Sequence, residues 1–526
     1  MFLSMVIGMG LVGASSPATA ASVPQQWINS TGPVASSNYQ TYTASSTGTS
    51  PAHVTLTLTQ SSALGFKIKS VFSDSTAGAT VASNNAMSDH IYDSANKSPI
   101  DWSLTDGNTD TGSFDYILPG SYLVTDTVTD SNGATATASV EVNTLGSAYS
   151  TVTPTRLLDT RYGIGAAKHT VGPNSIVKLR VEGAGPVPSS GVTAVVLNLT
   201  AVPVSGAGFV TAYPSDDGTA VPIASSLNYV PGQTVANLVT VPVGRDGYVY
   251  LADKGGTINL IADASGYYSR TAPDLYEPVM PQRLLDTRIG TGASKGAVPN
   301  GGTVKLAVAL GDTYLPPAGE MTAAAVNITV VNATNGGFVT AYADGASRPG
   351  TSNVNFAKGQ IVSNNAVVPV AADGRIDLTA ALGTTASVNL VVDIVGYYSA
   401  SPNFATTVFV PLAPSRVFDS RQDRQGQIAS GVEYDLNLGE WAMPVAAVEM
   451  NVTVTNTRSA GYLNLYTYGA PIPGTSNTNW TAGQTLAKGA SVTPSQFNGW
   501  IAIYNAGAGG TDVILDVSGY FENARV

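Results

Sequence analysis

The chain has 526 residues, a formal net charge of −11 and only 11% charged residues. It lacks cysteine and shows no stripe of Lys and Arg, so the sequence argues against disulfide staples and against nucleic acid as a partner. The acidic balance likewise argues against adhesion to anionic lipid. Abundant Gly, Pro, Val and Thr are typical of short strands joined by tight turns.

The first 50 residues predict export. Residues 2–12 form a short apolar run, and an A-x-A sequence follows at residues 18–20. This is the order of a signal peptide and its cleavage site, and the run is too short to span a bilayer. The alternative is a buried first strand, which the glycines of the run would weaken. We expect a signal peptide over residues 1–20, a Ser/Thr-rich linker over 21–50, and a secreted, extracellular protein associated with a cell surface.

Residues 51–147 are predicted to form a β-domain. Three motifs occur in order: W-S-L-T-D-G at 102–107, P-G-S-Y-L-V at 119–124 and V-T-D-S-N-G at 128–133. Together they resemble the PKD-like immunoglobulin-type domain. The resemblance implies a β-sandwich that acts as a spacer or as a contact module for protein or carbohydrate, and that is rarely catalytic.

A short acidic stretch inside this domain has two interpretations. Asp106, Asn108 and Asp110 place oxygen atoms at alternate positions, as calcium loops do. The stretch lacks the glycine and the distal glutamate of an EF-hand, and a polar hairpin turn is the alternative. We expect no cofactor, with calcium at these three residues as the only other possibility.

One module occurs three times in the rest of the chain. Each copy opens on R-[LV]-[LF]-D-[TS]-R, followed by N-x-T in an apolar run, Gly with an aromatic residue, N-[YFW]-x-x-G-Q and D-x-x-G-Y-[YF]. The copies are too long for solenoid repeats and suit independent domains. They are expected at residues 148–270 (module 1), 277–400 (module 2) and 408–523 (module 3).

Strands are the expected elements of these modules. In module 1, alternating or apolar segments predict strands at residues 176–181, 193–202, 208–213, 236–243, 248–252 and 258–262. The expected fold class is therefore all-β, with tandem antiparallel β-sandwich domains of immunoglobulin-like or jelly-roll type: one PKD-like domain plus three homologous modules. Short joins that contain proline predict a rod or a compact cluster.

The composite motif of the three modules resembles a repeat that is common in exported actinobacterial proteins. There it often follows a hydrolase domain or forms most of a surface protein. The resemblance covers about residues 150–523 and is carried by P-x-R-L-L-D-T-R, V-V-L-N-L-T and D-x-x-G-Y-Y. Module 3 departs most from the pattern.

The repeated R-x-x-D-x-R motif is interpreted as a structural clamp. In an extended strand Asp159 and Arg161 share a face while Arg156 points to the other face. A guanidinium of the motif can hold a ligand carboxylate or sulfate, or it can pair internally, with Asp263 as a candidate partner. We favour the internal clamp. Its residues are Arg156, Asp159, Arg161, Arg283, Asp286, Arg288, Arg416, Asp419 and Arg421.

The N-[YFW]-x-x-G-Q motif is the candidate ligand site. An aromatic platform flanked by amides suits a sugar ring, whereas the alternative is a turn whose aromatic residue belongs to the core. We expect a half-exposed platform because its ring type varies among the modules, which a tight core tolerates poorly. The residues are Asn228, Tyr229, Gln233, Asn355, Phe356, Gln360, Asn479, Trp480 and Gln484.

No catalytic motif is found in the sequence. There is no H-E-x-x-H, G-x-S-x-G or cysteine nucleophile, and the N-x-T triplets lie in apolar strands, where a buried Asn–Thr pair is expected rather than a glycan. We expect a non-catalytic surface protein acting as a structural or adhesive array. Binding of cell-wall or other polysaccharide by the modules is the alternative, and a glycosidase ranks third, since two carboxylates would suffice for one.

Overall fold

The computed structural model describes residues 41–523 except 48–49, 61–64, 91–92, 100–102, 105–108, 116–120, 144–145, 215–219, 424–425, 440–441 and 443–444. The signal peptide and most of the linker therefore lie outside the described residues. The described part is antiparallel β-structure with one short helix, α1 (Ser420–Asp423). The expected all-β class of tandem sandwich domains is confirmed.

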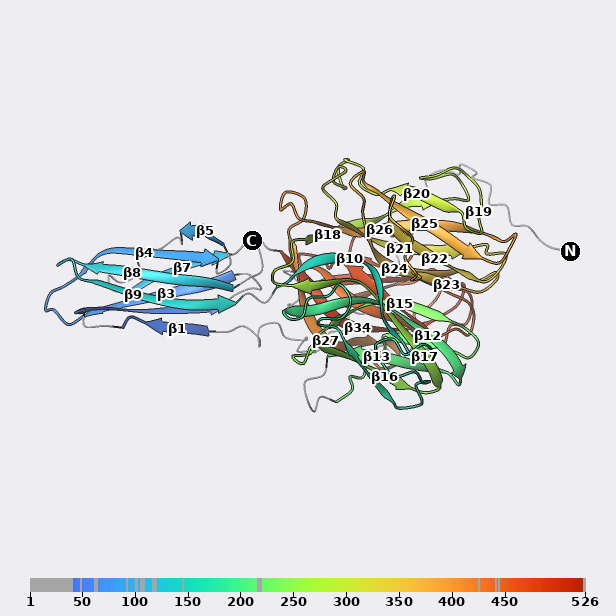
Figure 1. The fold of residues 1–526 in the computed structure, drawn as a ribbon, viewed down its shortest axis with the longest axis horizontal. Helices are drawn as coiled ribbons and strands as arrows, with labels where there is room; N and C mark the ends of the chain where they lie inside the picture. The colour runs from blue at the N-terminus through green and yellow to red at the C-terminus, as the bar shows by residue number, and fades with distance from the viewer. Residues whose placement is uncertain are drawn as a thin grey trace.

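The N-terminal domain is a sandwich of two sheets, with strand orders β1-β2-β3-β7-β6 and β5-β4-β8-β9. Every second residue of β2 is buried, as expected of a strand with one face on a core. In Figure 1 the domain projects as an elongated arm from a rounder body. Its strands are β1 (Thr41–Ser45), β2 (Ala52–Gln60), β3 (Gly65–Asp74), β4 (Val81–His90), β5 (Asp93–Pro99), β6 (Ser103–Leu104), β7 (Thr109–Asp115), β8 (Ser121–Asp130) and β9 (Thr135–Asn143).

Module 1 consists of eight strands in two four-stranded sheets, with orders β10-β17-β12-β15 and β11-β16-β13-β14. In chain order these sheets contain strands 1-8-3-6 and 2-7-4-5, which is the jelly-roll arrangement of two Greek keys. The strands are β10 (Ala148–Asp159), β11 (Ile176–Arg180), β12 (Val192–Ser205), β13 (Gly208–Tyr213), β14 (Leu227–Tyr229), β15 (Val235–Pro242), β16 (Tyr248–Lys254) and β17 (Thr257–Ser269).

Modules 2 and 3 repeat this topology, and module 2 has one additional short strand, β19. Module 2 contains β18 (Leu275–Asp286), β19 (Val298–Pro299), β20 (Thr303–Ala307), β21 (Ala323–Val331), β22 (Gly337–Ala343), β23 (Val354–Phe356), β24 (Val362–Pro369), β25 (Arg375–Leu382) and β26 (Ser387–Ser399). Module 3 contains β27 (Thr407–Asp419), β28 (Glu433–Asn437), β29 (Val445–Thr455), β30 (Gly461–Thr467), β31 (Thr478–Trp480), β32 (Leu486–Val492), β33 (Trp500–Asn505) and β34 (Asp512–Asn523).

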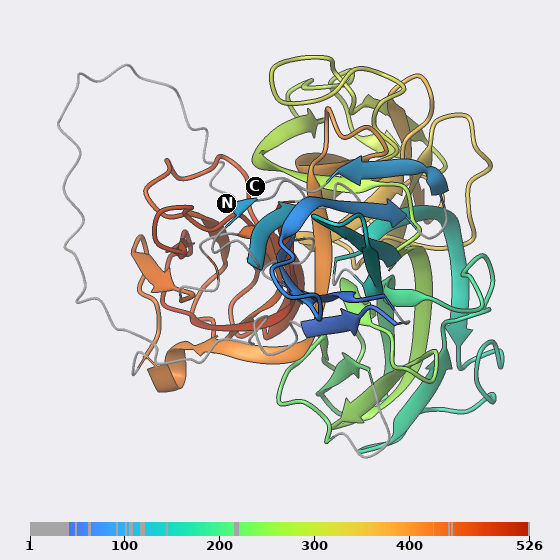
Figure 2. The same ribbon diagram turned by 90° about the vertical axis from the view of Figure 1, so that its left-hand side faces the viewer.

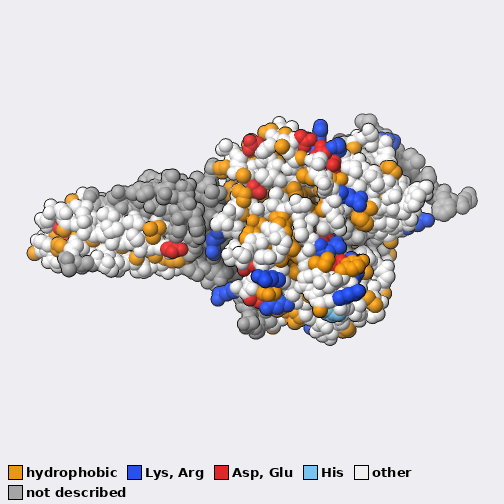
Figure 3. Space-filling view, in the orientation of Figure 1, with side chains coloured by type: hydrophobic (Ala, Val, Ile, Leu, Met, Phe, Trp, Pro, Cys, Tyr) orange, Lys and Arg blue, Asp and Glu red, His pale blue; other side chains and the backbone are white. Residues whose placement is uncertain are grey.

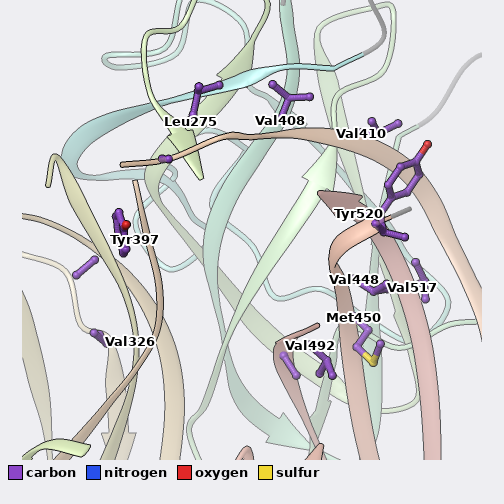
Figure 4. Packing of buried hydrophobic residues seen from close by; sticks show 14 of the residues in the cluster. Leu275, Val326, Tyr397, Val408, Val410, Val448, Met450, Val492, Val517 and Tyr520 are labelled. Atoms are coloured by element: carbon purple, nitrogen blue, oxygen red, sulfur yellow. The ribbon is translucent and has the colours of Figure 1, made fainter. Parts of the chain in front are cut away.

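The three modules form a compact cluster, with one module after another around a common centre (Figure 2). Strand β18 of module 2 pairs with β27 of module 3 at Tyr276 and Thr407, which joins their sheets into one. Figure 4 shows Leu275 and Val408 close together beside this junction. Strand β21 is buried along its whole length, because one face packs inside its sandwich and the other faces neighbouring modules.

Three pairs of closely packed, tilted aromatic rings fill the centre of the cluster. The ring from the first strand of each module lies on the ring from the last strand of the next module, at centroid distances of 4.2, 4.1 and 4.5 Å. The pairs close a cycle: Tyr149 with Tyr398, Tyr276 with Phe521, and Phe409 with Tyr268.

Candidate functional site: the grooves between the repeat modules

A fork of two hydrogen bonds ties the first strand of each module to its last strand. In module 1, Arg156 donates from Nε and Nη2 to the two carboxylate oxygens of Asp263, at 2.8 and 3.2 Å. Burial raises the pKa of Asp263, and the hydrogen bond from Arg156 opposes that shift. The equivalent forks are Arg283–Asp393 and Arg416–Asp516.

The remaining residues of the R-x-x-D-x-R motif form a second ion pair beside the fork. Arg161 donates from Nε and Nη2 to Asp159, at 2.9 and 2.7 Å. Burial alone would raise the pKa of Asp159, but the hydrogen bonds from Arg161 outweigh it and the pKa is lowered. The equivalent pairs are Arg288–Asp286 and Arg421–Asp419.

The expectation that Arg156 faces away from Asp159 is wrong. Nη1 of Arg156 donates to Asp159 at 3.2 Å, so both arginines of the motif meet the same carboxylate. The reason is a register shift between Arg156 and Leu158, where β10 pairs with β17. Such a bulge changes the face on which the following side chains lie. The aspartates are buried, whereas 25% of the Arg156 side chain and 35% of the Arg161 side chain stay exposed.

The expectation of an exposed aromatic platform is also wrong. Tyr229, Phe356 and Trp480 are 2%, 6% and 4% exposed, so a sugar ring cannot stack on them. The polar tips of two rings find partners inside their own modules. The Tyr229 hydroxyl donates to Asp253 at 2.5 Å, and the Trp480 indole donates to the carbonyl of Ser459 at 2.9 Å.

Variation of ring type at a buried position has a local explanation. Gly507 leaves room for the larger indole, since a Cβ there would lie 3.3 Å from Trp480. Tyr229 instead requires a hydrogen-bond partner for its hydroxyl, and Asp253 together with the Gly256 N–H supplies it. Each module therefore adjusts its own core to its ring, so ring variation does not indicate exposure.

The amide residues of the same motif divide into two groups. Gln360 and Gln484 close their turns by accepting from the backbone N–H groups of Ala357 and Thr481, at 2.9 and 3.0 Å. Their carbonyl oxygens are therefore engaged in the turn rather than offered to a ligand. Gln233 occupies the equivalent turn in module 1, where its backbone N–H donates to Val230 at 3.4 Å.

Two of the three asparagines of the motif, Asn228 and Asn479, lie at boundaries between modules. Asn355 and Asn479 donate to serines of their own loops, Ser352 and Ser476, at 3.1 and 3.0 Å. Of the candidate ligand residues, Asn228 and Asn479 line the grooves at these boundaries.

Two described grooves bring the arginine motif of one module against the asparagine loop of another. The larger, of about 520 Å³, lies between modules 1 and 3, and Arg416 and Arg421 face Asn228 across it. The smaller, of about 300 Å³, lies between modules 2 and 3, and there Arg283 and Arg288 face Asn479. Both volumes lie within the range of about 300–1,000 Å³ that is usual for small-molecule sites.

The grooves favour anions over cations. Neither groove has an Asp or Glu among its described lining residues. The carboxylates of the clamps hold the arginines in place. The remaining Nη1 group of each fork arginine faces the aspartate of its own R-x-x-D-x-R motif, at 4.0 Å for Arg283 and 3.7 Å for Arg416. Arg288 and Arg421 bind that aspartate through Nε and Nη2 and make no hydrogen bond through Nη1 to a described residue. The larger groove also contains threonine hydroxyls and an apolar wall, which suit a polyhydroxylated ring with an apolar face.

The asparagines of the N-x-T triplets are the main feature that sequence reasoning missed. Nδ2 of Asn198 donates to the carbonyl of Ser352 in module 2 at 2.6 Å, and Nδ2 of Asn327 donates to Ser476 in module 3 at 2.5 Å. Asn451 closes the cycle by donating to Ser225 in module 1. Asn198 and Asn327 are buried as expected and Asn451 is partly buried, but their partners lie in the next module.

The described residues do not test the predicted calcium site. Asp106 and Asn108 lie outside the described residues, and of Asp110 only the backbone in β7 is described, so the calcium site stays a prediction. Among the described residues there is no group of three or more His, Cys, Asp or Glu side chains that could hold a metal ion. No helix in the described part of the chain is long and apolar enough to cross a membrane.

No family model matches the chain, and no curated protein matches it in sequence. Among solved structures, the α-L-rhamnosidase of Streptomyces avermitilis in complex with L-rhamnose aligns at 7% identity over 87% of this chain, with a TM-score of 0.15. This chain covers 55% of that enzyme.

Two further solved structures align at the same TM-score of 0.15. The N-terminal CBM22-1-CBM22-2 tandem domain of Xyn10C from Paenibacillus barcinonensis aligns at 10% identity over 48% of this chain and 100% of its own length. A triple-jelly-roll protein of an archaeal virus turret aligns at 9% identity over 72% of this chain and 91% of its own length. Scores this low support no statement about function.

Proposed function

We propose that the chain is an exported, non-catalytic surface protein in which the three modules form one rigid adhesive head and the N-terminal domain is a spacer. The observation that carries the proposal is the closed cycle of contacts between modules. Three asparagines each bond to the next module, and three aromatic pairs stack across the same boundaries. Such a body keeps its surface features in fixed relative positions, as attachment requires.

Two observations support the non-catalytic part of the proposal. A glycosidase needs two carboxylates on either side of the scissile bond, and neither described groove has one in its lining. The repeated aspartates are buried behind arginines instead. The described residues of the arm are mostly uncharged on the face in Figure 3, which suits a spacer more than an electrostatic contact.

Binding of polysaccharide by the head is the second candidate function. The grooves favour it, because they combine cationic groups, hydroxyls and apolar side chains at the boundaries of the head. Repetition of weak sites in a rigid head would add avidity on a polymer.

Retention of the purified full-length chain on insoluble material tests both functions. The chain is incubated with peptidoglycan and with insoluble neutral and acidic polysaccharides, and bound protein and released sugar are measured. We expect retention on at least one polymer and no release of sugar. Release of sugar by the pure chain would overturn the non-catalytic proposal. Absence of retention on every polymer, combined with absence of the chain from the surface of the cells that make it, would overturn the adhesive head.

A further inference from the structure

Among its described residues, the groove between modules 1 and 3 has one positive charge without a carboxylate partner. Arg416 and Arg421 are neutralised by the two clamp carboxylates of module 3, Asp516 and Asp419. Lys254, at the end of β16, lines the same groove and makes no ion pair with any described residue. Because no carboxylate is among the described lining residues, the groove presents net positive charge to a ligand.

In this groove the guanidinium of Arg421 has one N–H edge that can bind an anion. Arg421 uses Nε and Nη2 to bind Asp419, at 2.8 Å and a shorter contact of 2.6 Å, and 43% of its side chain is exposed. Nη1 has no hydrogen bond to a described residue. The ion pair fixes the plane of the guanidinium, so little side-chain freedom is lost when this edge binds an anion.

The rest of the groove suits a sugar ring. Thr455 and Thr485 lie on one wall with their hydroxyls 2.7 Å apart, and each hydroxyl can also hydrogen-bond a ligand. Phe209 and Ile223 supply apolar surface from module 1, on the other side of the groove, and Ile223 is 84% exposed at the rim. Hydroxyl groups on one side and apolar carbon on the other match the two faces of a pyranose ring.

The groove between modules 2 and 3 is a natural comparison. It contains Arg283 and Arg288 with Tyr462 in place of Phe209, but it is smaller. Phe209 pairs with Lys254 across β13 and β16. In the smaller groove the counterpart of Lys254 is Ala506 of module 3, whose N–H donates to the carbonyl of Tyr462 at 3.0 Å. The lysine is therefore absent from the smaller groove, and the groove between modules 1 and 3 is the more cationic one.

We propose that the groove between modules 1 and 3 binds a carboxylate-bearing sugar residue of an acidic polysaccharide, with Lys254 and Arg421 contacting the carboxylate. The single uncompensated positive charge is matched by the single negative charge of one uronate residue. This inference deepens the second candidate function and rests on it.

The test uses the full-length chain and trigalacturonate as the probe, with titration calorimetry as the readout. The wild-type chain is expected to bind trigalacturonate and to bind its uncharged methyl ester at least about tenfold more weakly. Lys254→Ala should weaken trigalacturonate binding at least about fivefold. This variant should fold, because alanine already stands at the equivalent position of module 2. Lys295→Ala, at an exposed lysine of module 2, is the matched control and should bind as the wild type does.

A second variant tests the same groove without changing Lys254. Ile223→Asp adds a negative charge at the exposed rim and should weaken trigalacturonate binding while leaving the fold unchanged, because that side chain is mostly in solvent. Equal binding of the acid and its ester, or equal binding by wild type and Lys254→Ala, would overturn the proposal, as would absence of binding to trigalacturonate. If trigalacturonate fails while the chain is retained on another polymer, this inference fails and the adhesive head stands.

Discussion

At the scale of single residues, each module is held by an arginine fork between its first and last strands. The guanidinium of Arg156 binds the carboxylate of Asp263. Asp263 is 3% exposed, and the Arg156 side chain is itself only partly accessible. Removal of one partner from such a pair leaves a buried charge that nothing compensates, and this costs more than the pair itself contributes.

Arg156→Leu should therefore lower the free energy of unfolding of the full chain by about 3 kcal/mol. The double variant Arg156→Leu/Asp263→Leu should recover most of that loss, because the orphaned carboxylate is gone. Urea unfolding followed by circular dichroism measures both, and Arg180→Leu, at an exposed arginine of β11, is the control. A double variant no more stable than the single one would contradict the clamp.

Lys488 is the least expected residue of the head. It occupies the position of Asn237 and Asn364, is 4% exposed, and donates to the carbonyl of Ala236 in module 1 at 2.6 Å. Burial lowers the pKa of Lys488 to about 7. Oδ1 of Asn327 has no hydrogen-bond partner among the described residues, whereas the equivalent Oδ1 of Asn198 accepts from Asn364 at 2.8 Å.

Lys488→Asn should stabilise the chain by about 2 kcal/mol near pH 7, because it removes a buried cation and supplies a donor for Asn327. In the wild type, the unfolded chain keeps the lysine proton up to about pH 10, and the folded chain loses it near pH 7. Stability should therefore rise with pH between about 7 and 10 through this residue, and the variant should lack that rise. Urea midpoints at several pH values measure it. If the stability of the wild type and that of the Lys488→Asn variant change with pH in the same way, Lys488 does not have a lowered pKa in the folded chain.

The jelly-roll sheets explain the repeated D-x-x-G-Y-[YF] motif at the scale of elements. A Cβ at Gly396 would collide with the ring of Tyr276, which β18 lays across β26, and the same holds for Gly266 with Tyr149. The glycine therefore lets the ring of the first strand pack flat on the last strand, from where it reaches Phe521 of the next module.

Gly396→Ala should cost about 1–3 kcal/mol, the usual range for overpacking, because it displaces Tyr276 from its stack with Phe521. Gly350→Ala is the control: a Cβ there would meet nothing within 4 Å, and the position has no positive φ. Thermal unfolding of the two variants separates the effects. Equal melting temperatures of the Gly396→Ala and Gly350→Ala variants would contradict a role of Gly396 in making room for the ring of Tyr276.

The strands of single modules could be predicted from the sequence, but the contacts between modules could not. Alternation and turn residues locate β11, β12, β13, β15 and β16 of module 1 within about three residues, because one face of each strand packs in its own sandwich. The predicted strand at 258–262 covers only the first half of β17, and no strand is predicted for β10 or β14. The partner of Asn198 lies in another module, at Ser352, and no local pattern reports such a distant contact. The buried aromatic rings were misjudged for a related reason, since Gly507 and Asp253 adapt each core from elsewhere in the chain.

The closed cycle of modules is the central claim at the scale of the whole molecule. Each module contacts both of the others. A substitution at the boundary between two modules should therefore also lower the stability of the third module. Modules 1 and 2 contain no tryptophan, whereas three of the five tryptophans of the chain, Trp441, Trp480 and Trp500, belong to module 3. Tryptophan fluorescence therefore reports on module 3 against a background from the N-terminal region.

The most direct test is urea unfolding of the full-length Asn198→Ala variant, followed by tryptophan fluorescence and by circular dichroism. Asn198 bonds only across the boundary of modules 1 and 2, to Ser352 and Asn364, and its loss should cost about 1–3 kcal/mol. If the head is one closed body, the fluorescence transition of module 3 shifts to lower urea together with the circular dichroism transition. A fluorescence transition that stays at the wild-type midpoint, while circular dichroism shows a separate earlier step, would contradict the closed cycle.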